Sequence, residues 1–296
     1  MRVMPSQPNI VFLHIPKTAG QSVHNFLVRL FGQAAVSPAR VNEHLTVMSI
    51  PEIRQYQVTS GHMDWASLDC IEQPRFVFTV LRHPVDRILS FYFFLRREAE
   101  KTPEQELRLP HNQGKHAALN LSCDEYFSGG PPMLRTFLDN HYDNFYAYFF
   151  AGRTYDARQR LTGRQRVDPT LTAQKIVDMA LANISTLDGV YPLDGLDKLE
   201  GDLCRIAGRG TEGKPMQMPR ANRGEDDDRE ARMEKLRSLG ATRVTFDRID
   251  QMTSLDQIIW GELLRNFVPT PEPARFRPPW DRPRLNHLEV RPPLDA

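Results

Sequence analysis

The chain has 296 residues, and 40% of them are hydrophobic, which is enough to bury one sizeable core, so we expect a single domain. Its formal net charge of +1 argues against a general attraction to nucleic acid or to an anionic membrane. The three cysteines are far apart in sequence and form no CxxC pair, which argues against a disulfide scaffold or a zinc site and favours a reducing, cytoplasmic compartment. No stretch approaches the roughly 20 apolar residues of a membrane span, so none is expected.

The first predicted element is a strand over Asn9 to His14. It contains four consecutive apolar residues, too few for a helix, which is typical of a strand buried on both faces. After the loop "HIPKTAGQS", apolar residues recur from Val23 to Leu30 at helical spacing, and Gly32 stands where that helix can end. The order is therefore strand, loop, helix.

Similar units follow along the chain. Phe76 to Leu81 is a second buried strand ahead of a helix that begins near Pro84, and a shorter strand is expected over Gln57 to Ser60. The stretch "LDGVYPLDGLDKLEGDLCRIAG" is a third candidate strand-to-helix unit. Strands alternating with helices predict an α/β fold with a mostly parallel central sheet and helices on both faces.

Two segments are less regular. Residues 98–120 are polar and contain two prolines, and we expect a mobile excursion above the sheet, either a substrate lid or a disordered stretch. Residues 269–296 carry recurring prolines, which predicts an extended tail that adds no core. The predicted domain therefore spans residues 1–268.

The loop after the first strand has the composition of an anion site. In parallel sheets, ligands bind beyond the carboxyl ends of the strands, where helix N-termini present free N–H groups. Lys17 adds a positive charge, and Gly20 allows close backbone approach, so the loop can bind phosphate or sulfate. The alternative is an ordinary turn with a surface lysine. The loop differs from GxxxxGK[ST], and no magnesium carboxylate motif follows, so no metal is predicted.

A second anion site is expected at the next unit. Arg82 ends its strand, and Ser90 comes eight residues later, about two turns up the following helix. An arginine fork and a serine hydroxyl can hold a second phosphate. Arg87 is a further candidate, although a solvated helix edge is the favoured interpretation of that residue.

The stretches "HIPKTAGQS" and "LRHPVDRILSFY" together resemble the two nucleotide-binding signatures of sulfotransferases that use 3′-phosphoadenosine 5′-phosphosulfate, especially the carbohydrate type typified by the heparan sulfate 2-O- and 6-O-sulfotransferases. The resemblance implies a P-loop-like three-layer fold, with the 3′-phosphate held by Arg82 and Ser90. It also makes "MPRANRG" similar to the family's late basic loop, with contacts from Asn222 and Arg223, and "DNFYAYFFAG" similar to its segment after the substrate-binding excursion. The 5′-phosphosulfate would be held by Lys17, Thr18, Ala19, Gly20, Gln21 and Ser22.

Candidate catalytic residues follow from the reaction that this resemblance implies. Sulfuryl transfer to an alcohol needs a base, and histidine is suited to that role near neutral pH. His62 follows Gly61 in "TSGHMDW", as the catalytic histidine does in the heparan-type enzymes. His14 is the rival, since it either acts at the site or packs under the loop. Lys17 would stabilise charge on the leaving oxygen.

Asp64 and Trp65 of that stretch, together with His14, are candidates for acceptor binding. Asp64 either orients His62 or contacts the acceptor. Trp65 either stacks on a sugar or belongs to the core, and the core is favoured.

The predicted function is sulfuryl transfer to a hydroxyl of a glycan or another hydroxylated metabolite, with adenosine 3′,5′-bisphosphate as product. Two alternatives stay open: a P-loop-type kinase, and a non-catalytic protein that binds adenosine 3′,5′-bisphosphate. The sequence does not indicate the acceptor or the oligomeric state.

Overall fold

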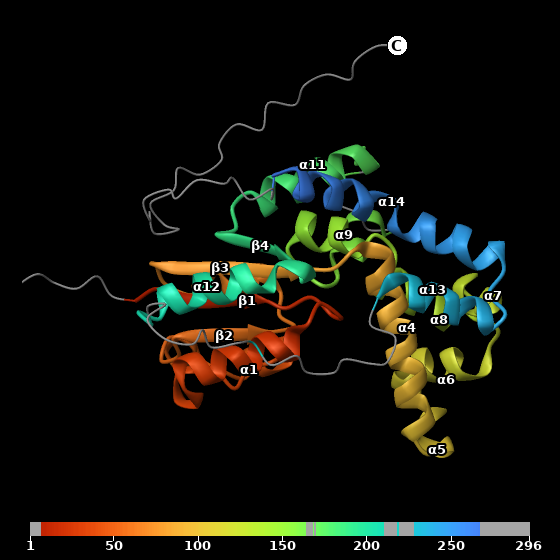
Figure 1. Cartoon of the computed structure of the whole chain (residues 1–296), viewed down its shortest axis with the longest axis horizontal. Coiled ribbons are helices and arrows are strands. Elements are labelled where there is room, and N and C mark those ends of the chain that lie inside the picture. The colour runs from red at the N-terminus through yellow and green to blue at the C-terminus, as the bar shows by residue number, and fades with distance from the viewer. Residues whose placement is uncertain (1–6, 164–167, 169, 210–217, 219–227, 267–296) are drawn as a thin grey trace, which may run out of the picture.

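The computed structural model describes residues 7–163, 168, 170–209, 218 and 228–266. Within these residues the sheet has four strands in the order β2-β1-β3-β4, and every neighbouring pair is parallel. Figure 1 shows the sheet on one side of the molecule and a group of helices on the other. The first three strands agree with the predicted ones to within a residue at each end, and the fourth lies in the third predicted strand-to-helix unit. Their bounds are β1 (Asn9–Leu13), β2 (Val58–Gly61), β3 (Arg75–Leu81) and β4 (Gly189–Pro192).

The strand register determines which residues meet at the carboxyl edge. Leu13 pairs with Gly61 on one side and with Thr79 on the other. The chain therefore leaves β1 and β2 at the same level, and His14 and His62 emerge side by side. Strand β3 continues past this level to Leu81, which pairs with Pro192.

Short 3₁₀ turns cover 33–35, 65–70, 110–112 and 193–195. The α-helices of the described residues are α1 (Gly20–Phe31), α2 (Asn42–Thr46), α3 (Ile50–Ile53), α4 (Pro84–Lys101), α5 (Glu104–Leu107), α6 (Gln113–Asn120), α7 (Cys123–Phe127), α8 (Pro132–His141), α9 (Phe145–Gly152), α10 (Ala157–Thr162), α11 (Ala173–Ile184), α12 (Leu196–Ile206), α13 (Arg229–Ser238) and α14 (Arg243–Asn266).

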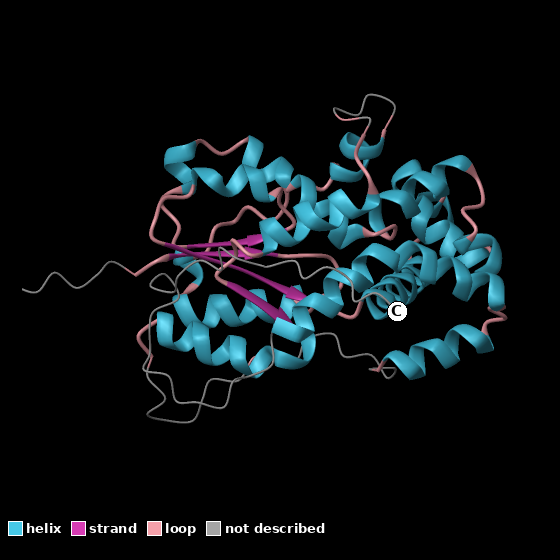
Figure 2. Ribbon diagram, turned by 90° about the horizontal axis from the view of Figure 1, so that it is seen from above, coloured by secondary structure: helices cyan, strands magenta, loops and turns pink. Residues whose placement is uncertain are grey.

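Helices cover both faces of the sheet, as Figure 2 shows. Because side chains alternate along a strand, Ile10 and Phe12 pack with α1 and α12 on one face, and Val11 and Leu13 pack with α9, α11 and the end of α14 on the other. The predicted three-layer α/β fold is confirmed.

A third cluster lies among the helices beyond the sheet. It gathers apolar side chains of α4, α6, α7, α8, α13 and the first half of α14. Arg87 enters the interior here, with 1% of its surface exposed, so its interpretation as a solvated helix edge was wrong. The reason is that α9 covers this side of α4: the Arg87 guanidinium lies 4.8 Å from the ring centre of Phe145.

The segment 98–120, expected to be irregular, is largely helical. Helix α4 continues to Lys101, and α5 and α6 follow, with Leu107 and Ala118 buried. Its two prolines stand at the starts of helical turns, where a missing N–H costs little, so they did not signal an irregular chain. That the segment moves stays a prediction.

Among the described residues, no helix combines the length and the apolar character that crossing a bilayer requires. The predicted proline-rich tail over 269–296 lies outside the residues that the structure describes. The extent of the domain to residue 268 stays a prediction.

Candidate active site

The loop between β1 and α1 has the backbone geometry of an anion site. Lys17 and Ala19 adopt left-handed conformations, with φ of 72° and 62°. Thr18 is buried, and its hydroxyl donates to the carbonyl of Ile15 at 2.8 Å. Helix α1 starts at Gly20 with no acidic residue in its first turn and no side-chain cap. The first N–H groups of a helix, here those of Gly20 and Gln21, have no acceptor one turn earlier in the helix, and this fits a phosphate or sulfate group.

Gly20 has a packing role that the sequence did not indicate. A Cβ atom at this position would lie 1.5 Å from Nε2 of His14 and would overlap the imidazole ring. The absence of a side chain therefore makes room for His14 to pack under the start of α1. That a ligand approaches the backbone of Gly20 closely stays a prediction.

The ammonium group of Lys17 is partly buried among positive charges. Its Nζ lies 3.8 Å from the centre of the Phe94 ring. Burial, helped by the charges of Arg97, Arg82 and Arg232, lowers the pKa of Lys17 to about 8. A bound anion would stabilise the charged form of Lys17, because it would offset the positive charges around the ammonium group.

Arg82 connects the two predicted anion sites. Its Nη1 donates to the carbonyl of Lys17 at 3.2 Å, and its Nε donates to Asp86 at 2.5 Å. Asp86 also pairs with Arg232 of α13 at 2.7 Å. Ser90 lies one turn after Asp86 on α4, and Phe94, beneath Lys17, is one turn further. The structure thus brings Lys17 and Arg82 together and places Ser90 on the same helix face.

His14 and His62 stack at the carboxyl edge, with ring centres 4.0 Å apart. Nδ1 of His62 lies 2.9 Å from the carbonyl oxygen of His14 and 3.3 Å from the hydroxyl of Tyr155. A carbonyl only accepts hydrogen bonds, so Nδ1 carries the hydrogen and Nε2 keeps its lone pair. Burial lowers the pKa of His62, and the charges of Arg40 and Lys17 act in the same direction, against the bond to the His14 carbonyl.

His14 is more deeply enclosed. Burial holds its pKa well below the usual value, and the charges of His62, Arg40 and Lys17 add to that shift. Its Nδ1 is buried and has no hydrogen-bond partner among the described residues. Since its Nε2 edge faces Gly20, the ring occupies the position of a support under the loop.

Asp64 contacts Tyr155 rather than His62. Its carboxylate accepts a hydrogen bond from the Tyr155 N–H at 2.7 Å, and the Tyr155 hydroxyl donates to the His14 carbonyl at 2.7 Å. Tyr155 is therefore the residue that links Asp64 to the histidine pair. Sequence reasoning missed it, because nothing in its neighbourhood distinguishes it from other aromatic residues.

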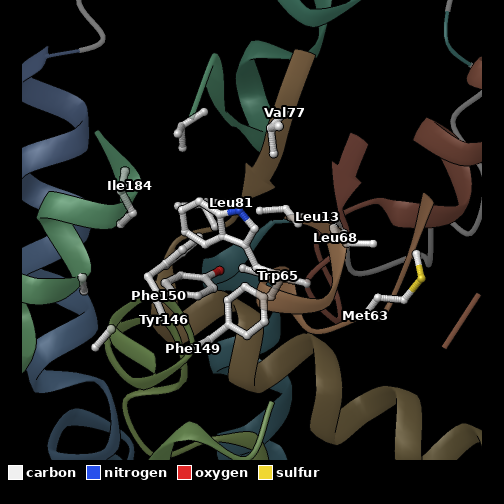
Figure 3. Packing of buried hydrophobic residues seen from close by; sticks show 14 of the residues in the cluster. Leu13, Met63, Trp65, Leu68, Val77, Leu81, Tyr146, Phe149, Phe150 and Ile184 are labelled. Carbon is white, nitrogen blue, oxygen red and sulfur yellow. The ribbon is translucent and has the colours of Figure 1, made fainter. Parts of the chain in front are cut away.

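Trp65 lies in the core. Only 4% of it is exposed, and Figure 3 shows its indole among Leu13, Leu81 and Phe150. The guanidinium of Arg153 lies 4.5 Å from its ring centre. This position favours the core interpretation over sugar stacking.

Two cations of the site carried no sequence signal. Arg40 precedes β2, its carbonyl accepts the N–H of His62 at 2.7 Å, and its guanidinium contacts Nδ1 of His24. Arg232 reaches the site from α13, far along the chain. The predicted contacts Asn222 and Arg223 lie outside the described residues.

These features describe an α/β protein that has, at one sheet edge, a loop whose geometry fits an anion, a group of lysine and arginine side chains, and a stacked pair of histidines. Residues 2–152 match the model of the sulfotransferase family, and the chain belongs to that family. A search of curated proteins found no match to the chain. The family assignment makes sulfuryl transfer the reaction class.

Proposed function

We propose that the protein transfers a sulfuryl group from 3′-phosphoadenosine 5′-phosphosulfate to a hydroxyl of a glycan or another hydroxylated metabolite. The observation that carries this proposal is the hydrogen bond from Arg82 to the Lys17 carbonyl. It brings together the two predicted anion sites, each with a positively charged side chain, at the ends of neighbouring strands. A donor with a phosphosulfate at one position and a phosphate at another has the charge distribution that two such sites fit.

The residues divide between the two ends of the donor. Lys17 and the N–H groups from Thr18 to Ser22 would hold the 5′-phosphosulfate, and Arg82 with Ser90 would hold the 3′-phosphate. When bound, the donor supplies an activated sulfuryl group. Arg232 adds charge beside Arg82, since both pair with Asp86. Asn222 and Arg223 remain predicted contacts.

His62 is the proposed general base. Its Nδ1 is fixed by the His14 carbonyl, which leaves Nε2 to take a proton from the acceptor hydroxyl. Its lowered pKa keeps the ring neutral at pH 7. His14 fits the role less well, because its Nε2 edge faces Gly20 within the loop. A supporting role for His14 agrees with this position.

Lys17 is the proposed charge stabiliser. Its ammonium group lies at the loop that would hold the sulfuryl end, in surroundings that favour binding of negative charge. Removing a preorganised donor of this kind typically costs about 3 to 4 kcal/mol of transition-state stabilisation.

Two other functions fit the protein less well. The family assignment favours sulfuryl over phosphoryl transfer, so a kinase fits less well. A binding-only protein would share both anion sites but would not need a histidine with a fixed tautomer, and His62 has one. That the reaction needs no metal stays a prediction.

The first test is nucleotide preference. Adenosine 3′,5′-bisphosphate should bind more tightly than adenosine 5′-monophosphate, because only the bisphosphate engages Arg82. A charge-assisted contact is worth roughly 1.5 to 3 kcal/mol, so Arg82→Ala should remove most of the preference and spare the monophosphate. Calorimetric titration of both nucleotides into both proteins measures this.

The control is Arg108→Ala, which removes an exposed arginine whose ion-pair partner is Glu104 on α5. It should leave both affinities unchanged. If the unaltered protein bound the two nucleotides with equal affinity, the assignment of the second anion site would be wrong. The proposal of this donor would then lose its main support.

A further inference from the structure

We propose that Tyr146 is a positioning residue, whose hydroxyl holds the Arg82 peptide so that the guanidinium faces the 3′-phosphate pocket. The proposal rests on the proposed function, because that function assigns Arg82 to the 3′-phosphate. Tyr146 belongs to α9 and comes to Arg82 from the covering layer of the sheet.

The hydroxyl of Tyr146 forms hydrogen bonds with both backbone polar groups of Arg82. It accepts a hydrogen bond from the Arg82 N–H at 3.2 Å and donates one to the Arg82 carbonyl at 2.9 Å. Arg82 lies just after the last paired residue of β3 and ahead of α4. Neither the sheet nor the helix supplies hydrogen-bond partners for these two groups, so the Tyr146 hydroxyl takes the place of the partners that regular secondary structure would provide.

Tyr146 is itself held in place by α14. The N–H groups of Tyr146 and Ala147, in the first turn of α9, donate to Asp256 at 3.2 and 2.9 Å. Just before them, the Asn144 side chain accepts from the Leu255 N–H at 2.7 Å. The start of α9 is thereby fixed to α14, and the Tyr146 ring is fully buried beside Phe149 and Phe150 (Figure 3).

The position of the Arg82 peptide determines where its guanidinium lies. The side chain extends from this peptide to Asp86 on one side and to the Lys17 carbonyl on the other. If the hydroxyl is removed, the partly buried N–H and carbonyl of Arg82 lose their partner, and the backbone there is free to shift toward another. A small displacement of a positioning group is enough to weaken a phosphate contact.

The test compares Tyr146→Phe with a matched control. The control is Tyr126→Phe, because the Tyr126 hydroxyl is equally buried but bonds the Tyr142 hydroxyl at 3.0 Å in the helical cluster. Adenosine 3′,5′-bisphosphate and adenosine 5′-monophosphate are titrated into the full-length protein and both variants, and thermal melting reports on folding.

We expect Tyr146→Phe to weaken bisphosphate binding roughly three- to tenfold, the size of one ordinary hydrogen bond, and to leave monophosphate binding unchanged. Tyr126→Phe should lower the melting temperature about as much as Tyr146→Phe does, but it should leave the ratio of the two nucleotide affinities unchanged. In an Arg82→Ala background, Tyr146→Phe should no longer change that ratio, because the group that it positions is absent.

The outcomes separate this proposal from the proposed function. If the unaltered protein prefers the bisphosphate and Tyr146→Phe keeps the same ratio, the positioning role is overturned and the donor assignment stands. If the unaltered protein shows no preference, the 3′-phosphate pocket itself is wrong. A change that persists in the Arg82→Ala background would also overturn the role, because Tyr146 would then act on another group.

Discussion

The pKa values of His62 and Lys17 are both lowered, with opposite consequences for their charge at neutral pH. Burial lowers the pKa of His62, so its ring is neutral at pH 7 and able to accept a proton. Burial lowers the pKa of Lys17 to about 8, so its ammonium is still mostly charged at pH 7 but loses its proton as the pH rises through about 8. The same enclosure therefore prepares a base and limits the pH range of the charge stabiliser.

A pH profile follows from Lys17. The charged form is needed to bind the donor, so kcat/KM for the donor should fall as the pH rises through about 8. In Lys17→Arg the guanidinium stays charged, so this alkaline fall should move to a higher pH even if the overall rate is lower. Measuring kcat/KM from pH 6 to pH 10 in both proteins tests this. An alkaline limb that stays near pH 8 in Lys17→Arg would assign the titration to another group.

Residues at strand ends were predictable, and residues arriving from elsewhere were not. The meeting of His14 and His62 follows from parallel strands that end together, and the contact of Lys17 with Arg82 follows from the next strand. Tyr155, in the turn between α9 and α10, and Arg232, on α13, come from far along the chain, and no local pattern marks them.

At the scale of elements, the loop and the first turn of α1 depend on close packing against His14. Gly20 lies at the helix start, where the imidazole occupies the place of a side chain. Glycine is otherwise unfavourable in a helix. Its presence here is explained by packing, because its backbone is helical and needs no positive φ.

Two glycine substitutions should therefore have opposite signs. Gly20→Ala should lower the free energy of unfolding by roughly 1 to 3 kcal/mol, the usual cost of overpacking, because its Cβ would overlap the His14 ring. Gly201→Ala, in α12, should raise it by about 0.5 to 1 kcal/mol, because a Cβ there meets only the end of Arg205 at 4.0 Å. Urea denaturation of both variants measures the difference. A neutral Gly20→Ala would show that His14 does not need this space.

Helices with clear apolar periodicity were predicted well, and short polar ones were not. The stripes of α1, α4 and α12 identified them in the sequence. The segment 98–120 was misjudged because α5 has a single turn and buries only Leu107, which is too little for a periodic signal. Its helices form because α6 packs against α4 and α8, and a tertiary contact of that kind is not visible in a local pattern.

At the scale of the whole molecule, α14 connects the layer over the sheet with the helical cluster. Ile249 and Met252, in its first half, pack in the helical cluster, and Ile259 and Leu263 pack over the sheet. Asp256 lies between these two halves, and Figure 1 shows α14 running from one region to the other. The residue that fixes α9 therefore occupies the junction of the two regions, and its ionisation should affect the stability of the whole fold.

Burial raises the pKa of Asp256 to about 7, against the opposing effects of Arg87 and of the N–H groups of Ala147 and Tyr146. An unfolded aspartate has a pKa of about 4, so between these values the folded state holds a proton that the unfolded state has lost. The stability that this residue contributes is present at low pH and is lost as the pH rises through about 7.

Asparagine does not titrate, so the free energy of unfolding of the unaltered protein, relative to Asp256→Asn, should decrease from pH 5 to pH 8, by at most about 1.4 kcal/mol per pH unit. Urea denaturation at several pH values measures this difference, and titrations of other groups cancel in it. Asp250→Asn, at an exposed position of the same helix, should give a much flatter difference. A difference for Asp256→Asn that is flat, or that grows with pH, would mean that this carboxylate is ionised in the folded protein throughout the range.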